Sequence, residues 1–317
     1  MNHFRQSKIY RHKFRTHLQT AHGIWSERES IVLRQEDEQG VVSFGELCPT
    51  PGFVSYHLDD LIPMVKDWEK GNSCINHNFL SSAVSCIGSE IWNSMRPQED
   101  FKEVFTAELF LSNPSFKSKA RVYKKKIGVQ DIDLEIENVF ELFDSISLKS
   151  KVRLDANESL TMEEVFRWNE AFRNESRLQF LEQPLPRNDL PRLFELDGRL
   201  DISLALDESL VWKNDLDFFT KSGWNGFYVI KPTLFSDWER TIKFIKDNSY
   251  RTIVSTVFES PFGFEAVCRC ALFSNLTAGL DRNLFNLDEL ELSGHHSQPI
   301  EVGKISISLL DELWERL

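Results

Sequence analysis

The chain has 317 residues, of which 41% are hydrophobic and 27% are charged, as is usual for a globular protein. No apolar run reaches the roughly 20 residues that a membrane helix needs, and the net charge of −12 argues against a nucleic-acid partner. The basic N-terminus has no apolar segment of the kind found in secretory signals, so we expect no membrane partner and a cytoplasmic location.

The pattern of cysteines also favours a cytoplasmic location. They are odd in number and form no CxxC pair, which favours reduced, buried or incidental thiols. The five are Cys48, Cys74, Cys86, Cys268 and Cys270.

Residues 1–100 are predicted to form an α+β unit. The stretch "SIVLRQEDEQGVVSFGEL" indicates a hairpin that turns through Gly40. A Pro/Gly loop, "CPTPGF", follows it, and the stretches "YHLDDLIPMVKDWEKG" and "NHNFLSSAVSCIGSEIWNSM" are typical of helices. Strands followed by helices favour an α+β arrangement.

From about residue 105 onward, short apolar runs alternate with amphipathic helix patterns. One such helix shows Ile136, Val139, Phe140 and Phe143 on a single face. Eight such runs, most of them one strand-plus-helix unit apart, predict an α/β fold with a TIM-type (β/α) barrel over residues 101–290. An open doubly wound sheet is the alternative. The runs are "AELFLS", "ARVYKKKIG", "KVRLDAN", "LQFLEQPL", "ISLALDES", "FYVIKPT", "TIVSTVFES" and "LFNLDEL".

Charged side chains end several of these runs. The groups at successive strand ends are separated by 29, 27, 25 and 24 residues, so each step is one strand-plus-helix unit. At the carboxyl ends of barrel strands such groups converge on one mouth, where catalytic residues gather. In chain order they are Lys124 and Lys126, which share a face of their strand, then Asp155, Glu182, Asp207 and Lys231.

The residue types at these ends indicate a hard metal ion. Three carboxylates facing one another would repel and raise their own pKa values unless a cation lay between them. Residues 105–290 contain no histidine, so the donors would be oxygen atoms. Such a set favours Mg2+, or Mn2+, over zinc.

The lysines predict acid–base chemistry beside that ion. Burial and nearby positive charge lower the pKa of an ammonium group, which makes the amine a usable general base. A metal, a base and an opposing cation suit proton abstraction next to a carboxylate, so the expected partner is a small-molecule carboxylate substrate.

With these residues the chain resembles the enolase superfamily, in its muconate-lactonizing subgroup. That subgroup is known by Lys-x-Lys on the second barrel strand, by Asp, Glu and Asp on the next three, and by Lys on the sixth. The matching stretches here are "YKKK", "RLDAN", "LEQPLP", "LALDES" and "VIKPTL". The resemblance implies that residues 1–100 form a capping domain, on which residues 291–317 pack.

The resemblance also implies roles for the residues. Lys126 would be the base, Lys231 would stabilise the negative charge of an enediolate from the opposite side, and Lys124 would tune Lys126 and approach the substrate carboxylate. Mg2+ would stabilise the same enediolate. Its expected ligands are Asp155, Glu182 and Asp207, supported from behind by Asn157 and Glu208.

Substrate contacts are expected from Arg153, Ser255 and the backbone of Gly263, where a helix N-terminus would offer N–H groups. The loop "FGELCPTPGF" favours a dehydratase of that subgroup, acting on a hydroxycyclohexadiene carboxylate. The stretch "TVFESPFGF" is bulky for this family, so Phe258 and Pro261 are expected to reshape the substrate site. The cap loop that contacts substrate is placed at residues 20–27.

Two alternatives remain open at this stage. An N-acylamino acid racemase or a dipeptide epimerase would use both lysines as bases. Epimerases tend to carry Asp-x-Asp on the eighth strand, where this chain has a single Asp288. A non-catalytic barrel that binds a ligand is the other alternative. The pattern does not distinguish a monomer from a homo-oligomer.

Overall fold

The computed structural model describes residues 4–20, 23–54, 56–72, 77–93, 102–110, 120–282, 292–296 and 298–317. These residues form two compact units. The first contains residues 1–105, 231–249 and 254–317, and the second contains residues 106–230 and 250–253. The units follow spatial contacts rather than the predicted limits of 1–100 and 101–290, so that domain division stays a prediction.

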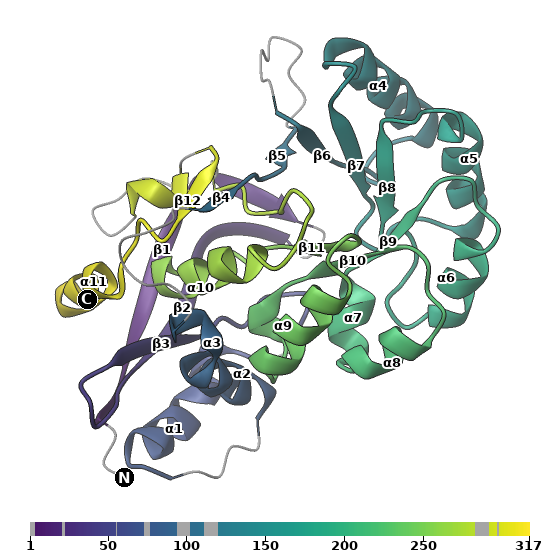
Figure 1. The fold of residues 1–317 in the computed structure, drawn as a ribbon. Helices are drawn as coiled ribbons and strands as arrows, with labels where there is room; N and C mark the ends of the chain where they lie inside the picture. Colours follow the sequence, from purple (N-terminus) through teal and green to yellow (C-terminus); the bar gives the residue numbers. More distant parts are fainter. Residues whose placement is uncertain are drawn as a thin grey trace. The chain divides into compact units, whose positions relative to one another are not determined.

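The first unit contains an antiparallel sheet of three strands in the order β1-β2-β3 (Figure 1). Its strands are β1 (Phe4–Thr20), β2 (Gly23–Glu36) and β3 (Val42–Leu47). The predicted hairpin is confirmed as β2 and β3, and Gly40 takes the positive φ of 77° that its turn requires. Strand β1 was not predicted, although Tyr10, His12 and Phe14 alternate into the core as strand residues do.

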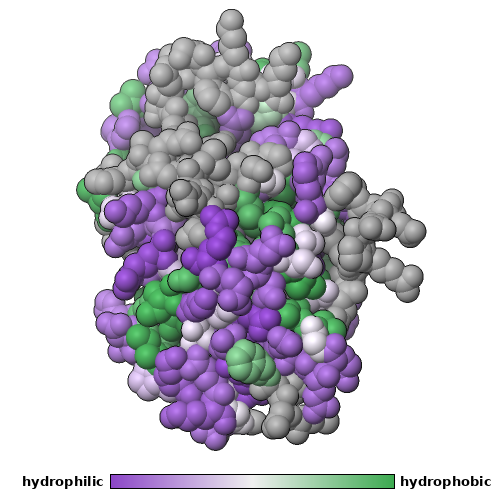
Figure 2. Space-filling view, turned by 90° about the vertical axis from the view of Figure 1, so that its left-hand side faces the viewer, coloured by the Kyte–Doolittle hydropathy of each residue, from purple (hydrophilic) through white to green (hydrophobic). Residues whose placement is uncertain are grey.

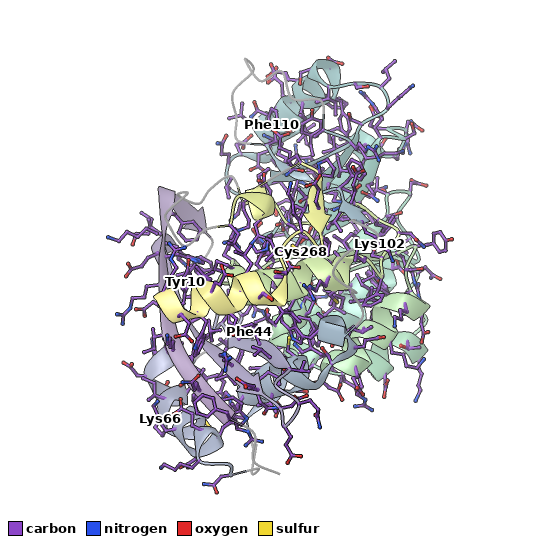
Figure 3. All side chains as sticks on the ribbon, turned by 60° about the vertical axis from the view of Figure 1, so that its left-hand side comes forward. Tyr10, Phe44, Lys66, Lys102, Phe110 and Cys268 are labelled. Carbon is purple, nitrogen blue, oxygen red and sulfur yellow. The ribbon has the colours of Figure 1, made fainter. Side chains whose placement is uncertain are left out.

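Helices cover this sheet and bury its apolar residues. Figure 3 labels three residues of this core: Tyr10 on β1, Phe44 on β3 and Cys268 on α10, all buried. Near the C-terminus, Trp314 packs on Phe44, and Asp311 forms an ion pair with Arg34. The helices are α1 (Leu58–Glu69), α2 (Asn78–Gly88), α3 (Glu90–Asn93), η1 (Pro232–Leu234), α9 (Trp238–Asp247), α10 (Pro261–Ala271), η2 (Ser293–His296) and α11 (Ile307–Arg316); β4 (Lys102–Val104) pairs with β12 (Ile300–Val302).

The second unit is built on a parallel sheet whose strands follow one another in chain order. The order β5-β6-β7-β8-β9-β10-β11 has no reversal, which excludes the doubly wound alternative over these strands. The eighth predicted strand, in 284–290, lies outside the described residues, so closure into a barrel stays a prediction. The strands are β5 (Glu108–Leu109), β6 (Val122–Lys126), β7 (Lys151–Asp155), β8 (Leu178–Glu182), β9 (Leu204–Leu206), β10 (Phe227–Ile230) and β11 (Thr252–Val254).

Amphipathic helices connect these strands, as the sequence predicts. Figure 1 shows α4, α5 and α6 on one face of the curved sheet. Helix α4 turns Val139, Leu142 and Phe143 into the core, and the side chain of its N-cap residue, Asp131, accepts from backbone N–H groups of the first turn. The helices are α4 (Ile132–Ser145), α5 (Met162–Phe172), α6 (Leu190–Asp197), α7 (Glu208–Lys213) and α8 (Leu216–Lys221).

Among the residues that Figure 2 colours by hydropathy, hydrophilic ones predominate, and apolar ones gather in separate patches. Among the described residues, no helix is both long enough and apolar enough to span a bilayer. The described cysteines, Cys48, Cys86, Cys268 and Cys270, are buried and free, and Cys74 lies outside the described residues.

Candidate active site

The register of the parallel sheet brings charged residues to one level at its carboxyl edge. Lys126 pairs with Asp155 between β6 and β7, and Asp155 pairs with Glu182 between β7 and β8. Asp207 follows β9 directly and is the N-cap residue of α7. The three carboxylates that the sequence places at successive strand ends are therefore neighbours along one edge, and each is at least nine-tenths buried.

Lys124 forms the centre of this edge. Its Nζ lies 2.8 Å from Asp155 Oδ2 and 2.9 Å from Glu182 Oε1. Burial alone disfavours the ammonium form, but the charges of Asp155, Glu182 and Asp207 outweigh it and raise the pKa of Lys124 above its usual value. The structure thus pairs Lys124 with the carboxylates, whereas the resemblance implies that Lys124 approaches the substrate carboxylate.

This arrangement bears on whether the carboxylates fit a metal ion. Over the described ranges, no group of three or more His, Cys, Asp or Glu side chains is already arranged to hold one. The carboxylates nevertheless converge on a cation, the Lys124 ammonium, and all the donors are oxygen atoms. A set of this kind fits a hard divalent ion that replaces the ammonium.

Lys126 ends β6 and is only partly buried. Burial lowers the pKa of Lys126, and the neighbouring Lys124 charge lowers it further, while Asp155 and Glu208 oppose the shift. A lysine with a lowered pKa gives up its proton more easily than an exposed one, which is what a general base requires.

Lys231 follows the last residue of β10 and belongs to the other compact unit. Its Nζ lies 4.6 Å from the ring centroid of Phe53, in the Pro/Gly loop after β3. The residues after it are held by Thr233, which donates to Glu259 Oε1 at 2.8 Å. Phe53 and Glu259 were not predicted as site residues, although the loop "CPTPGF" and the run "TVFES" contain them.

The residues expected to support the ligands do lie together. Asn157 donates through Nδ2 to Glu208 Oε1 at 3.3 Å, and its backbone N–H donates to Asp155 Oδ1 at 3.1 Å. Asn157 also has a positive φ of 42°, which a non-glycine residue adopts only when its surroundings hold it there.

Arg153 is expected to bind substrate, and in the structure it contacts two residues of the neighbouring strand β8. It is 1% exposed, and its Nε donates to Gln179 Oε1 at 2.8 Å. Its guanidinium lies over the ring of Phe180. Burial lowers the pKa of Arg153 to about 10, against the opposing charge of Glu182.

The N-terminus of α10, expected to bind a substrate carboxylate, is occupied by a carboxylate of the chain itself. Gly263 N–H donates to Glu46 Oε2 at 2.9 Å, and Ser260 N–H donates to Glu46 Oε1 at 2.8 Å. A Cβ at Gly263 would lie 2.3 Å from Glu46 Oε2, so this close approach requires glycine. Ser255 donates to Gly279 O at 3.2 Å. Glu46 therefore takes the N–H groups that the sequence analysis reserved for substrate.

The bulky loop after β11 packs against strands β1 and β2. Phe258, at a positive φ of 65°, contacts Phe14 and Trp25 edge-on, with ring centroids 5.5 and 6.5 Å away. Pro261 begins α10. Of the predicted cap loop at residues 20–27, Thr20 ends β1 and residues 23–27 lie in β2, while residues 21 and 22 lie outside the described residues.

Known proteins resemble this chain in the region that forms the charged edge of the parallel sheet. Residues 115–235, which contain the lysine pair, all three carboxylates and Lys231, match the family described as "Enolase C-terminal domain-like". The o-succinylbenzoate synthase of Thermosynechococcus vestitus is 27% identical over 98% of both chains. That of Haemophilus influenzae is 25% identical over 80% of this chain and 82% of its own.

Solved structures give the same fold. An o-succinylbenzoate synthase from Thermosynechococcus elongatus, solved with Mg in its active site, superimposes with a TM-score of 0.79 at 24% identity and covers 99% of both chains. The L-Ala-D/L-Glu epimerase of Bacillus subtilis gives 0.68 at 17% identity, covering 86% of this chain and 88% of its own. The chain is therefore an enzyme whose residues 115–235 belong to the enolase C-terminal domain-like family.

Proposed function

We propose that the chain is an o-succinylbenzoate synthase, a lyase that depends on Mg2+. It would remove water from 2-succinyl-6-hydroxy-2,4-cyclohexadiene-1-carboxylate to give aromatic o-succinylbenzoate, a step of menaquinone synthesis. The observation that carries this proposal is the likeness along 98% of the chain to a curated enzyme of that activity. Lys126 and the three carboxylates at one sheet edge supply the chemistry that the reaction needs.

Lys126 would act twice. As a neutral amine it removes the proton from the carbon that bears the substrate carboxylate. The resulting ammonium then gives a proton to the departing hydroxyl on the same face, so that water leaves and the ring becomes aromatic. The lowered pKa of Lys126 favours the first step, and the nearby Asp155 and Glu208 favour the second because they stabilise the ammonium.

Asp155, Glu182 and Asp207 would hold the Mg2+ ion, which supplies positive charge where the carboxylate gains electron density. Lys124, relieved of its place among these carboxylates, would turn to the substrate carboxylate. Lys231 would contribute a second positive charge, and its place on the face opposite Lys126 stays a prediction. The ion in the related structure is Mg, and nothing in the comparisons points to Mn2+.

A spectroscopic assay tests the proposal. The full chain with Mg2+ and the cyclohexadiene substrate is expected to produce the absorbance of the aromatic product, and removal of the ion with EDTA is expected to stop it. Absence of product with fresh substrate and Mg2+ would refute the proposed activity.

Incubation in D2O separates this activity from the racemase and epimerase alternatives. Those enzymes exchange the α hydrogen of N-acylamino acids or dipeptides for deuterium without loss of water. The epimerase structures found here are 17% identical and indicate the fold alone. Asp288, which bears on an epimerase, lies outside the described residues. Oligomeric state and a cytoplasmic location stay predictions.

A further inference from the structure

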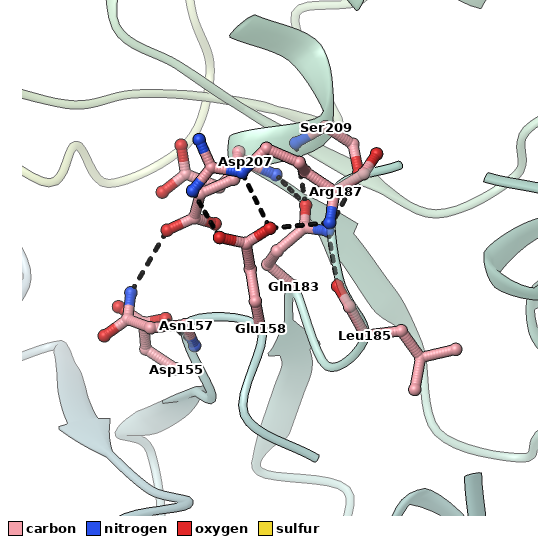
Figure 4. Close-up of polar contacts among 9 residues, drawn as sticks. Asp155, Asn157, Glu158, Gln183, Leu185, Arg187, Asp207 and Ser209 are labelled. Carbon is pink, nitrogen blue, oxygen red and sulfur yellow. Dashed lines mark hydrogen bonds and ion pairs between the residues drawn. The ribbon is translucent and has the colours of Figure 1, made fainter. Parts of the chain in front are cut away.

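A closed ring of hydrogen bonds lies beside Asp207 and the loop that follows Asp155 (Figure 4). Its members are Glu158, Gln183, Arg187 and Ser209, called here the Gln183 ring. Glu158 N–H donates to Gln183 O at 2.8 Å, and the Glu158 carboxylate accepts from Arg187 N–H at 2.6 Å and from its guanidinium. Ser209 Oγ donates to Arg187 O at 3.0 Å and accepts from Gln183 Nε2 at 2.8 Å, which closes the ring.

The Gln183 side chain uses its whole hydrogen-bonding capacity while fully buried. Its Oε1 accepts from the backbone N–H groups of Asp207, at 3.0 Å, and Ser209, at 3.1 Å. Its Nε2 donates to Leu185 O at 2.9 Å as well as to Ser209. Two donors and two acceptors are what a primary amide offers, so no other side chain of similar shape reproduces this set.

The backbone around the ring is strained. Gln183 has a φ of 37° and Glu158 a φ of 67°, both in the left-handed region that non-glycine residues seldom adopt. Such conformations persist when surrounding contacts hold them, and they concentrate at functional sites. Here the ring itself supplies these contacts.

Each candidate metal ligand is connected to the Gln183 ring by a hydrogen bond or by a few residues of chain. Glu182 is the residue before Gln183, and the Asp207 backbone N–H donates to the Gln183 side chain. Asp155 begins the loop that Glu158 anchors. Mg2+ demands near-octahedral geometry, so small displacements of its carboxylates weaken binding. We infer that Gln183 is a positioning residue that sets the spacing of the Mg2+ ligands; the inference rests on the ligand set in the proposed function.

Gln183→Leu tests this inference, with Asn169→Leu as the matched control. Asn169 is also buried, and its Oδ1 also accepts two backbone N–H groups, those of Asp201 and Ile202, but before β9 rather than after it. Both variants lose a buried amide. Only the first loses it beside the carboxylates.

The measurement is Mg2+ affinity, by isothermal titration calorimetry on the metal-free full chain. Gln183→Leu is expected to weaken Mg2+ binding about 10- to 100-fold, as losses behind metal ligands do. The Mg2+ affinity of Asn169→Leu is expected to stay within about threefold of that of the unsubstituted chain. This substitution removes a buried amide away from the carboxylates, so it should change only the stability of the fold. In steady-state assays, excess Mg2+ should restore most of kcat to Gln183→Leu, because the metal requirement rather than the chemistry has changed.

Ser209→Ala provides a milder variant in case Gln183→Leu does not fold. It breaks the ring but leaves the Asp207 N–H bond to Gln183, so a loss of about 3- to 10-fold in Mg2+ affinity is expected, below the range for the full removal. An unchanged affinity in the folded Gln183 or Ser209 variant overturns the inference, as do equal losses in Gln183→Leu and Asn169→Leu. An unsubstituted chain that binds no Mg2+ overturns the inference and the metal centre together. Mg2+ binding without aromatic product refutes the proposed substrate alone.

Discussion

Glu46 in the first unit and Glu182 in the second are both buried at the end of a strand, yet their partners differ in kind. Glu46 is held by neutral donors, the N–H groups of Ser260 and Gly263 and the Ser260 hydroxyl. Glu182 faces the ammonium of Lys124. A buried carboxylate with neutral backbone donors belongs to the scaffold, whereas one paired with an ammonium group already faces a positive charge, as a metal ligand would.

The largest expected effect on activity is at Lys126, beside the carboxylates of the second unit. Lys126→Ala removes the proposed base and should lower kcat about 10^3-fold or more, because general bases contribute roughly 10^2- to 10^4-fold and here the same group also protonates the leaving group. The measurement is the rate of aromatic product formation. Lys125→Ala is the control on the same strand, since Lys125 points to the opposite face and lies over Phe110. Equal losses in both variants would contradict the assignment of Lys126.

The two glutamates can be compared directly with the same substitution. Glu182→Gln should weaken Mg2+ binding by about 100-fold, because it removes a charged ligand and leaves Lys124 short of a partner. Glu46→Gln should leave Mg2+ affinity nearly unchanged and lower the free energy of unfolding by about 1–3 kcal/mol, the usual cost of a mismatched buried hydrogen bond. Calorimetric titration and urea unfolding measure the two effects. The comparison fails if Glu46→Gln also loses Mg2+ affinity.

A smaller effect is expected at Phe53, whose ring lies against the Lys231 ammonium. A cation–π contact of about 0.5–2 kcal/mol corresponds to a loss of roughly 2- to 30-fold in kcat/KM if that contact positions Lys231. Phe53→Leu keeps the bulk but not the π face, and Phe53→Ala loses both. Similar activity in Phe53→Leu and the unsubstituted enzyme would show that packing alone matters there.

The smallest expected effect is a pH dependence at Glu46. Burial raises the pKa of Glu46 from its usual 4.5, while the Ser260 donors oppose the shift. The folded state therefore holds the proton more tightly than the unfolded state, so the contribution of Glu46 to stability is greatest at low pH. It declines as the pH rises past 4.5 to the raised folded value.

Urea unfolding at a series of pH values measures this contribution as the difference between the unsubstituted chain and Glu46→Gln. That difference should become less favourable to the unsubstituted chain as the pH rises. A difference that does not change with pH would show that Glu46 titrates normally in the folded state.

Local pattern determined much of this protein. Apolar runs and amphipathic helices predicted β6 to β10 with their connecting helices, because repeated strand-plus-helix units fold into parallel strands in chain order. The same spacing predicted that Asp155 and Glu182 would lie side by side, and their register shows that they do. The 17-residue strand β1 was missed because its pattern mixes basic and apolar residues over its whole length.

The partners of these side chains were decided by the tertiary structure alone. No spacing rule connects Gly263 with Glu46, 217 residues earlier, or closes the ring through Gln183. Successive side chains of a strand point to alternate faces, so the local sequence predicts the direction in which each side chain points. The donor or acceptor that it meets comes from a distant segment, and only the folded chain brings the two together.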